Sequence, residues 1–226
     1  TVPHLICGGF SVNETEDALI NLHYLGIDNV LVLRGDAAKN EMSFEAEPGG
    51  HKYASDLLKQ VVDLNDGIYQ EEDLRDSHKT AFCIGVAGYP EKHFEAPNMD
   101  ADLQHLKKKV ELGADYIITQ MFFDNNKYHE FVKRCREMGI TVPIIPGLKP
   151  IYNKKQLTVL PKTFHIDLPS DLANAVHKCK TDLEVEKVGA EWLLMQSREL
   201  KKSGVPVLHY YTLGRPQLIA DVVGQI

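Results

Sequence analysis

The sequence predicts an α/β domain built on a parallel sheet, and two observations lead to this prediction. Short apolar runs rich in β-branched residues alternate with amphipathic stretches of helical period along the whole chain. Gly26, Gly113, Gly139 and Gly204 each close a helical stretch just before the next apolar run, and helices commonly end in a left-handed glycine. A repeated order of helix, glycine and strand is typical of consecutive βα units.

The apolar runs predict the strands. These are expected at His4–Cys7, Asn29–Leu33, Thr80–Ala87, Tyr116–Phe122, Val142–Pro146 and Val207–Tyr211. Each run is short and bounded by turn residues, as buried strands of parallel sheets are. Six strands with a helix after each indicate six βα units.

Helical stretches between these strands carry apolar residues on one side. The clearest of them cover Glu14–Tyr24, Tyr53–Leu64, Asp100–Leu112 and Asn126–Met138. In the last stretch, Tyr128, Phe131, Val132 and Cys135 recur at the spacing of one helical face. Each predicted helix therefore has a side that can pack on the sheet.

Six βα units could form an open doubly wound sheet or most of a (β/α)8 TIM barrel. Doubly wound nucleotide-binding folds usually carry a glycine-rich phosphate loop after the first strand, and the sequence contains neither G-x-G-x-x-G nor G-x-x-x-x-G-K-[ST]. Polar residues instead follow most predicted strands, as at Arg34–Asp36, Tyr89–His93 and Gln120. Chemistry spread over many strand ends is typical of the barrel, which the sequence therefore favours.

Composition limits the class of function. With 226 residues, 43% hydrophobic and 25% charged, the chain can bury a core, and residues 1–226 are expected to form a single domain. The net charge of −7 disfavours neutralisation of a nucleic-acid backbone. Because the four cysteines are scattered without ligand spacing, we expect no metal site and a reducing, cytoplasmic setting. No apolar run reaches the length of a membrane span.

Two loops after strands carry candidate ligand-binding residues. The strand at 29–33 leads into Arg34, Gly35 and Asp36, which are either a capped turn with a surface arginine or part of a ligand site. After the strand at 80–87, Tyr89–His93 combines an aromatic ring, a proline, a carboxylate and an imidazole. A flat aromatic ligand could stack there, and a solvated loop with a packed tyrosine is the alternative.

Two further positions carry candidate polar contacts. Asp102, His105 and Lys109 share one stripe of a predicted helix, at about 100° from its apolar stripe. This stripe could hold a ribityl and diphosphate chain, although an isolated row of charges is more often a solvated face. Gln120 is a lone amide among apolar residues. It could read the edge of a heterocycle or make a structural hydrogen bond to a neighbouring strand.

Seven motifs, in order along the chain, resemble those of methylenetetrahydrofolate reductase of the bacterial type. They are L-R-G-D at 33–36, Y-A-S-D-L at 53–57, Y-P-E-K-H at 89–93, D-L-x-x-L-K-x-K-V at 102–110, I-T-Q-x-F-F-D at 118–124, I-I-P-G at 144–147 and Y-T-L-x-R at 211–215. Each is weak alone, but all seven lie in register on the βα frame. The resemblance implies a (β/α)8 TIM barrel of which this chain carries the third to the eighth unit and lacks the N-terminal portion.

The resemblance also implies FAD as the cofactor, lying across the carboxyl ends of the strands. The residues that match the family's FAD contacts are His4, Leu33, Arg34, Gly35, Asp36, Tyr53, Ala54, Tyr89, His93, Asp102, Lys108 and Lys109, together with His105 at a position where an amide is common. Asp36 is expected to be a catalytic residue, since in the family a carboxylate at this position lies near the pyrimidine edge of the flavin and tunes its reduction potential.

On the substrate side, the resemblance makes Gln120 the glutamine that reads the pterin and the second expected catalytic residue. Gln156, Tyr211 and Arg215 match positions that line the folate. Leu160 stands where some relatives place a phenylalanine that stacks on the ligand. Whether position 160 stacks on the ligand is therefore left open.

The implied reaction is the reduction of 5,10-methylenetetrahydrofolate to 5-methyltetrahydrofolate by NADH or NADPH, ping-pong through FAD, which supplies methyl groups for methionine synthesis. The family's general acid is a glutamate on the first strand, before the point where this chain begins. The expected partners are the nicotinamide cofactor, the folate and further copies of the protein, without nucleic acid or membrane. Two alternatives stay open: a truncated flavin-binding scaffold without turnover, and another TIM-barrel enzyme acting on a pterin-like substrate.

Overall fold

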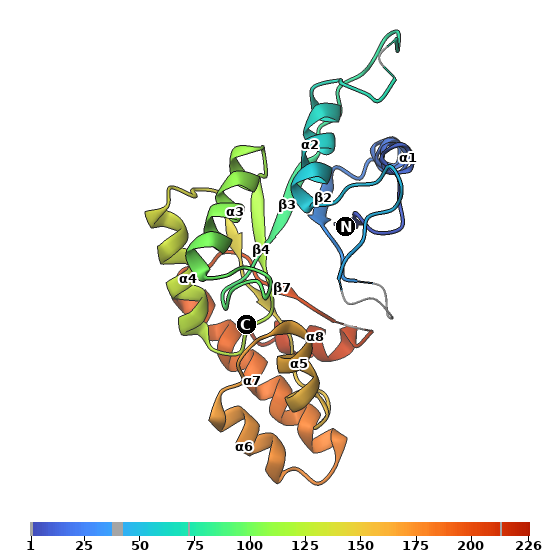
Figure 1. Cartoon of the computed structure of the whole chain (residues 1–226). Coiled ribbons are helices and arrows are strands. Elements are labelled where there is room, and N and C mark those ends of the chain that lie inside the picture. The colour runs from blue at the N-terminus through green and yellow to red at the C-terminus, as the bar shows by residue number, and fades with distance from the viewer. Residues whose placement is uncertain (1, 38–42, 72, 213) are drawn as a thin grey trace. The chain divides into compact units, whose positions relative to one another are not determined.

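A computed structural model describes residues 2–37, 43–71, 73–212 and 214–226, and strands and helices alternate along it (Figure 1). In chain order the elements are β1 His4–Ile6, α1 Val12–Tyr24, β2 Asn29–Leu33, α2 Ala54–Asn65, β3 Cys83–Gly88, α3 Met99–Glu111, β4 Tyr116–Thr119, α4 Asn125–Glu137, β5 Ile144–Ile145, β6 Gly147–Leu148, α5 Gln156–Phe164, α6 Ser170–Lys178, α7 Asp182–Lys202, β7 His209–Tyr210 and α8 Pro216–Val223. Within the described ranges, no helix is both long and apolar enough to cross a membrane.

The strands β1 to β5 form one sheet in chain order, and β6 pairs with β7 in a second, two-stranded sheet. The pairing is parallel where its register is defined, with His4 opposite Leu31 and Asn29 opposite Cys83. Parallel neighbours in sequence order require a crossover between them, and the helices α1 and α2 supply it for β1 to β3. The predicted α/β class with a parallel sheet is therefore confirmed.

The fifth predicted strand is divided at a proline. The prediction of one strand over Val142–Pro146 is wrong, because β5 ends at Ile145 and β6 begins at Gly147. Proline has no N–H to donate to a ladder, and the chain changes its pairing partner there. The Pro146 carbonyl accepts a hydrogen bond from the His209 amide at 3.0 Å. Since β5 and β6 are two halves of one unit, the strands still make six βα units.

Four other predicted strands are too long, and two of them, His4–Cys7 and Val207–Tyr211, shorten to His4–Ile6 and His209–Tyr210. The other two have a local cause. The strand starts at Cys83 rather than Thr80, because the Asn65 side chain accepts hydrogen bonds from the Thr80 hydroxyl and the Phe82 amide, at 2.7 and 2.8 Å. The next strand, predicted to reach Phe122, ends at Thr119. The side chain of Asp124 then caps α4, accepting from the Asn126 amide at 2.9 Å.

The predicted helices agree with α1 to α4 within two residues at each end. The four glycines expected to close helical stretches all have positive φ, from 71° at Gly26 to 117° at Gly113. The helices α5, α6 and α7 fill the stretch between β6 and β7, for which the sequence predicted a helical stretch closed by Gly204 but gave no helix bounds. Pro161 inside α5 breaks the usual helical signal there.

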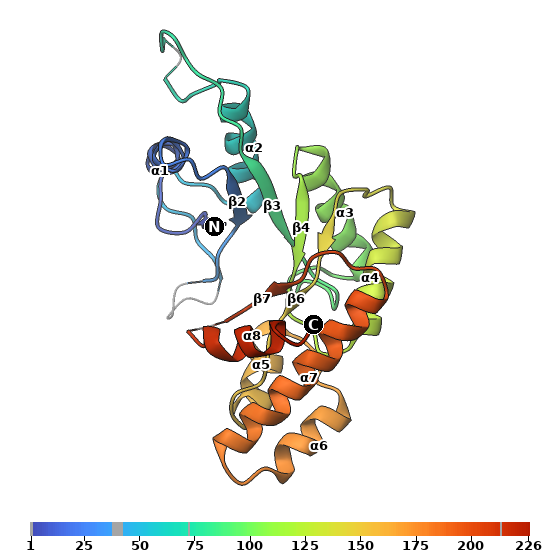
Figure 2. The ribbon, with the colours of Figure 1, turned by 180° about the vertical axis from the view of Figure 1, so that it is seen from behind.

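The chain forms two compact units, the first made of residues 1–87 and 105–117 and the second of residues 88–104 and 118–226. In the first unit, α2 buries Leu57, Leu58, Val61 and Leu64. In the second, α6 and α7 pack side by side (Figures 1 and 2). The core there contains Met121, Phe123, Ile151, Leu160, Ile166, Leu172, Val176, Cys179 and Val185.

A glycine in α7 allows close packing within the second unit. A Cβ at Gly189 would lie 2.0 Å from the Ile151 carbonyl oxygen. Alanine normally stabilises a helix interior relative to glycine by about 1 kcal/mol, but here the clash should dominate. We expect Gly189→Ala to lower the free energy of unfolding by about 3 kcal/mol in urea titrations, a cost typical of overpacking. Gly224→Ala is the control, since its Cβ would come no closer than 3.4 Å to a neighbour; equal stability of both variants would contradict this account.

Candidate functional site

In the first unit, the turn after β2 is tied to the end of β1. The Cys7 amide donates to the carbonyls of Leu33 and Arg34, at 3.3 and 3.1 Å. Gly35 has φ of 89°, a conformation that other residues rarely adopt. The turn leaves the Asp36 side chain exposed. A carboxylate is thus presented from a fixed backbone at the carboxyl end of β2.

Two further predicted flavin residues start α2. Tyr53 is the N-cap residue, its amide donates to the Asp56 carboxylate at 2.9 Å, and its ring is 51% exposed. Ala54 is the first helical residue. An exposed ring beside the first helical turn can contact a flat or anionic ligand. His4, at the first residue of β1, is also exposed.

The basic end of α3 also belongs to the first unit. Lys109 donates to the carbonyl of Ala87 in β3 at 2.8 Å, while His105 and Lys108 are exposed. Asp102 was predicted to lie on the same face of this helix as His105 and Lys109. It belongs to the second unit and makes a different contact. Its carboxylate accepts from the His93 amide at 2.8 Å, which fixes the loop after β3.

That loop carries stacked rings. The rings of Tyr89 and His93 meet edge to face with centroids 4.7 Å apart, and His93 stacks on Phe94 at 4.8 Å. Phe94 in turn stacks on His165 at 5.0 Å. Sequence reasoning named the first two rings and missed Phe94 and His165, although Phe94 directly follows the Y-P-E-K-H motif. The structure therefore supports an aromatic surface at this strand end.

The structure brings Gln120 and Tyr211 to the same place. The Tyr211 hydroxyl donates to the Thr119 carbonyl at 2.9 Å, and burial raises the pKa of this tyrosine. Gln120 follows directly, and its side-chain oxygen accepts from the Met121 amide at 2.9 Å. This contact orients the amide and leaves its NH₂ group as the donor without a protein partner among the residues that the structure describes. Gly147 makes the approach possible, since a Cβ there would lie 2.2 Å from the Thr119 oxygen.

The other two substrate-side residues meet at Tyr152. The Tyr152 amide donates to the Gln156 side-chain oxygen at 2.6 Å, and the Arg215 guanidinium lies 5.0 Å from the centroid of the Tyr152 ring. Sequence reasoning missed Tyr152, and an aromatic residue just after a strand was the available signal. Leu160 lies in the apolar core of the second unit. Residue 213 of the Y-T-L-x-R motif is outside the described residues.

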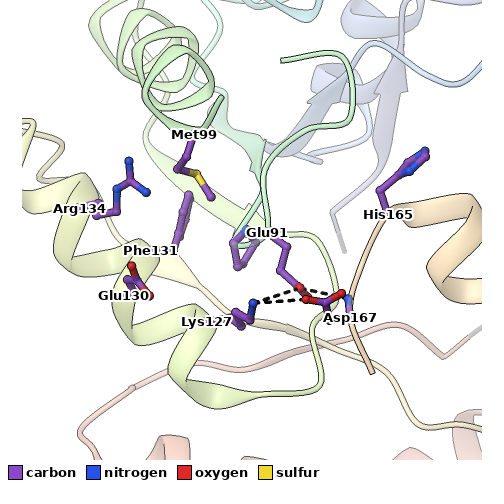
Figure 3. A pocket seen from close by; sticks show the side chains of 9 residues that line it. Glu91, Met99, Lys127, Glu130, Phe131, Arg134, His165 and Asp167 are labelled. Carbon is purple, nitrogen blue, oxygen red and sulfur yellow. Dashed lines mark hydrogen bonds and ion pairs between the residues drawn. The ribbon is translucent and has the colours of Figure 1, made fainter. Parts of the chain in front are cut away.

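A pocket of about 350 Å³ lies beside the same loop after β3 (Figure 3). The Glu91 carboxylate accepts from the Asp167 amide at 3.1 Å and lies 3.8 Å from the Lys127 ammonium. Its side chain is 9% exposed, and burial raises the pKa of Glu91 to about 7. The residues that line the pocket are Pro90, Glu91, Met99, Lys127, Glu130, Phe131, Arg134, His165 and Asp167. None of these is a predicted cofactor or substrate residue.

Glu91 makes stability depend on pH. Its folded-state pKa of about 7 lies above the ordinary value of 4.5, so the folded state binds this proton more tightly than the unfolded state. The resulting stabilisation is fully present below pH 4.5 and is lost as the pH rises through 7. In the wild type, this proton should make the free energy of unfolding fall by roughly 2–3 kcal/mol as the pH rises from 4.5 to above 7. In Glu91→Gln, this fall should be absent. Urea titrations at several pH values test this; Glu130→Gln, in the same pocket but exposed, should keep the wild-type slope, and an unchanged slope in Glu91→Gln would contradict the assignment.

A parallel α/β fold with polar and aromatic side chains after several of its strands is typical of the class of α/β enzymes that act from the carboxyl ends of their strands. Within that class, the family model for methylenetetrahydrofolate reductase matches residues 1–226. The chain belongs to the methylenetetrahydrofolate reductase family.

Curated relatives agree with this assignment. Methylenetetrahydrofolate reductase 1 of Schizosaccharomyces pombe is 34% identical over 227 residues, covering 100% of this chain and 35% of the relative. The 5,10-methylenetetrahydrofolate reductase of Escherichia coli is 34% identical over 220 residues, covering 96% of this chain and 66% of the relative. The chain thus spans about one third of the yeast relative's length and about two thirds of the bacterial one.

A solved structure supports the fold. It is a Clostridium thermocellum protein described as binding two copies of 5-methyl-5,6,7,8-tetrahydrofolic acid. It superposes with a TM-score of 0.57 at 18% identity, covering 97% of this chain and 69% of that one. At this identity the likeness shows the fold alone.

Proposed function

We propose that the whole protein reduces 5,10-methylenetetrahydrofolate to 5-methyltetrahydrofolate with NADH or NADPH, in ping-pong order and with FAD as cofactor. Family membership supports the activity. Within this chain, the orientation of the Gln120 side chain is the observation that carries the proposal. Its amide oxygen is held by the Met121 amide at 2.9 Å, so its NH₂ group is the part that remains to meet an acceptor atom on a pterin.

The residues of the first unit fit FAD by their chemistry. Arg34, Lys108 and Lys109 are cations suited to a diphosphate, and the exposed ring of Tyr53 suits a flat ring system. FAD, when bound, supplies the hydride-carrying group. The protein's own task is then to hold the cofactor and place a carboxylate, Asp36, from the rigid turn at Gly35. Although the chain has a net charge of −7, these cations supply local positive charge, so that the chain can still bind an anionic cofactor.

On the substrate side, we assign Gln120, Tyr211, Gln156 and Arg215 to the folate. Gln120 and Tyr211 share the end of β4, where the Tyr211 hydroxyl already donates to Thr119. Because burial raises the pKa of Tyr211, this hydroxyl stays protonated. Its role is therefore to shape and orient, while the Gln120 amide donates to the substrate.

Steady-state kinetics of the purified protein test the proposal. NADH or NADPH oxidation should require 5,10-methylenetetrahydrofolate, and double-reciprocal plots at several folate concentrations should give parallel lines, as ping-pong order demands. A flavin spectrum without folate-dependent oxidation would favour the scaffold without turnover. A colourless protein that FAD does not reconstitute would favour a different barrel enzyme and would contradict the proposal.

A further inference from the structure

Tyr152 connects three segments of the second unit. Its ring lies between the end of β6 and the loop before α8, and its hydroxyl donates to the Thr212 carbonyl at 3.1 Å. Its amide donates to Gln156, the first residue of α5. Tyr152 itself is 5% exposed, so it contacts substrate-side residues from behind rather than forming the surface they present.

Two cations lie on this one ring. The Lys149 ammonium lies 4.6 Å and the Arg215 guanidinium 5.0 Å from the ring centroid. Cation–π contacts of this kind attract each cation to the ring, while the two cations repel each other. Glu186 pairs with Arg215 at 3.0 Å. Two cations and one carboxylate leave this cluster positively charged, a state that suits an electron-rich group on a ligand.

Lys149 is unusual because it is buried. It is 1% exposed, and its ammonium donates to the Pro150 carbonyl at 3.0 Å. Within the described part of the chain, no carboxylate forms an ion pair with it. Burial lowers the pKa of Lys149 to about 8. A buried lysine without an ion pair costs stability, which indicates that it is kept for a purpose other than folding.

We propose that Tyr152, held by Lys149, is a positioning residue that fixes Arg215 on the substrate side of the proposed folate site. The inference rests on the proposed function. In this arrangement Lys149 holds the Tyr152 ring, and the ring holds the guanidinium of the half-exposed Arg215 side chain. Arg215 then meets the ligand with less loss of side-chain entropy.

Substitutions in the full-length protein separate this role from a structural one. Tyr152→Leu removes the ring, and we expect it to raise KM for 5,10-methylenetetrahydrofolate about tenfold with a smaller change in kcat, as loss of binding shared by ground and transition states predicts. Tyr152→Phe keeps the ring and both cation contacts, so its KM should stay near the wild-type value. Oxidation of NADH with menadione as the acceptor does not need the folate and should be unchanged in both variants.

Lys149→Met tests the second part of the proposal. Removing a buried charge should leave stability unchanged or raise it, so a higher KM for the folate in this variant cannot come from unfolding. Tyr128→Phe is the matched control for Tyr152→Phe. Like Tyr152, Tyr128 is buried, at 4% exposed, and its hydroxyl donates to a backbone carbonyl, that of Ile144 at 2.7 Å. It should lose stability without a change in KM.

The outcomes distinguish the inference from the proposed function. Wild-type protein without folate-dependent activity would overturn the proposed function and this inference with it. Active wild-type protein with wild-type KM in Tyr152→Leu and Lys149→Met would overturn the inference alone. A higher KM in Tyr152→Phe equal to that in Tyr152→Leu would assign the effect to the hydroxyl and would also overturn it.

Discussion

Gln120→Glu is expected to lower kcat/KM for 5,10-methylenetetrahydrofolate by about 10- to 100-fold. A carboxylate can still accept the hydrogen bond that the Met121 amide donates at 2.9 Å, so the side chain should keep its place. It has no N–H to offer the substrate, however, and it brings an unpaired charge to a half-buried position. Losing one hydrogen bond to a ligand in this way costs about 1–3 kcal/mol, which corresponds to the stated range.

The measurement compares both halves of the reaction. Oxidation of NADH with menadione should remain at the wild-type rate in Gln120→Glu, because the substituted residue serves the folate only. Gln104→Glu makes the same chemical change at an exposed position of α3 and should leave both rates unaltered. Equal folate kinetics in Gln120→Glu and the wild type would contradict the assignment of Gln120 to the substrate.

Asp36→Asn is expected to raise the midpoint potential of the bound flavin by roughly 30 mV or more, which for a two-electron couple corresponds to about 1.4 kcal/mol. Reduction adds negative charge to a flavin, and a nearby carboxylate opposes this by Coulomb repulsion. Asp36 is exposed and follows Gly35, whose φ of 89° sets the direction of the turn. Removing the charge while keeping the shape isolates the electrostatic effect.

Equilibration of the flavin with redox dyes measures this potential. Glu45→Gln is the matched control, since Glu45 is an exposed carboxylate in the segment that follows the same turn. Its potential should equal that of the wild type. A potential that falls, or does not move, in Asp36→Asn would place its carboxylate away from the flavin.

The sequence predicted the order of strands and helices because burial in a parallel sheet imposes simple patterns on it. The strand Asn29–Leu33 was predicted with its correct bounds, since its central residues are buried on both faces. Errors arose where one side chain outweighs the apolar pattern. Asn65 ties down the residues before β3, and Pro146 divides β5 from β6. Neither effect can be read from periodicity.

Only part of the candidate site was predictable from the sequence. Motifs in the sequence named Gln120 and Tyr211, and the structure places them together at the end of β4. Tyr152 was missed, and Glu91 was named only as the carboxylate of the loop at 89–93, because their contacts come from neighbours distant in the chain, Arg215 and Asp167. The roles of the predicted flavin residues stay predictions, as does the assignment of the catalytic pair Asp36 and Gln120.

One measurement tests the central claim most directly: an anaerobic single turnover of the purified protein followed by its flavin absorbance and by product analysis. We expect that one equivalent of NADH or NADPH bleaches the flavin, that 5,10-methylenetetrahydrofolate restores the colour, and that an equal amount of 5-methyltetrahydrofolate forms. Flavin that is bleached but not reoxidised by the folate would contradict the account, as would reoxidation without formation of 5-methyltetrahydrofolate.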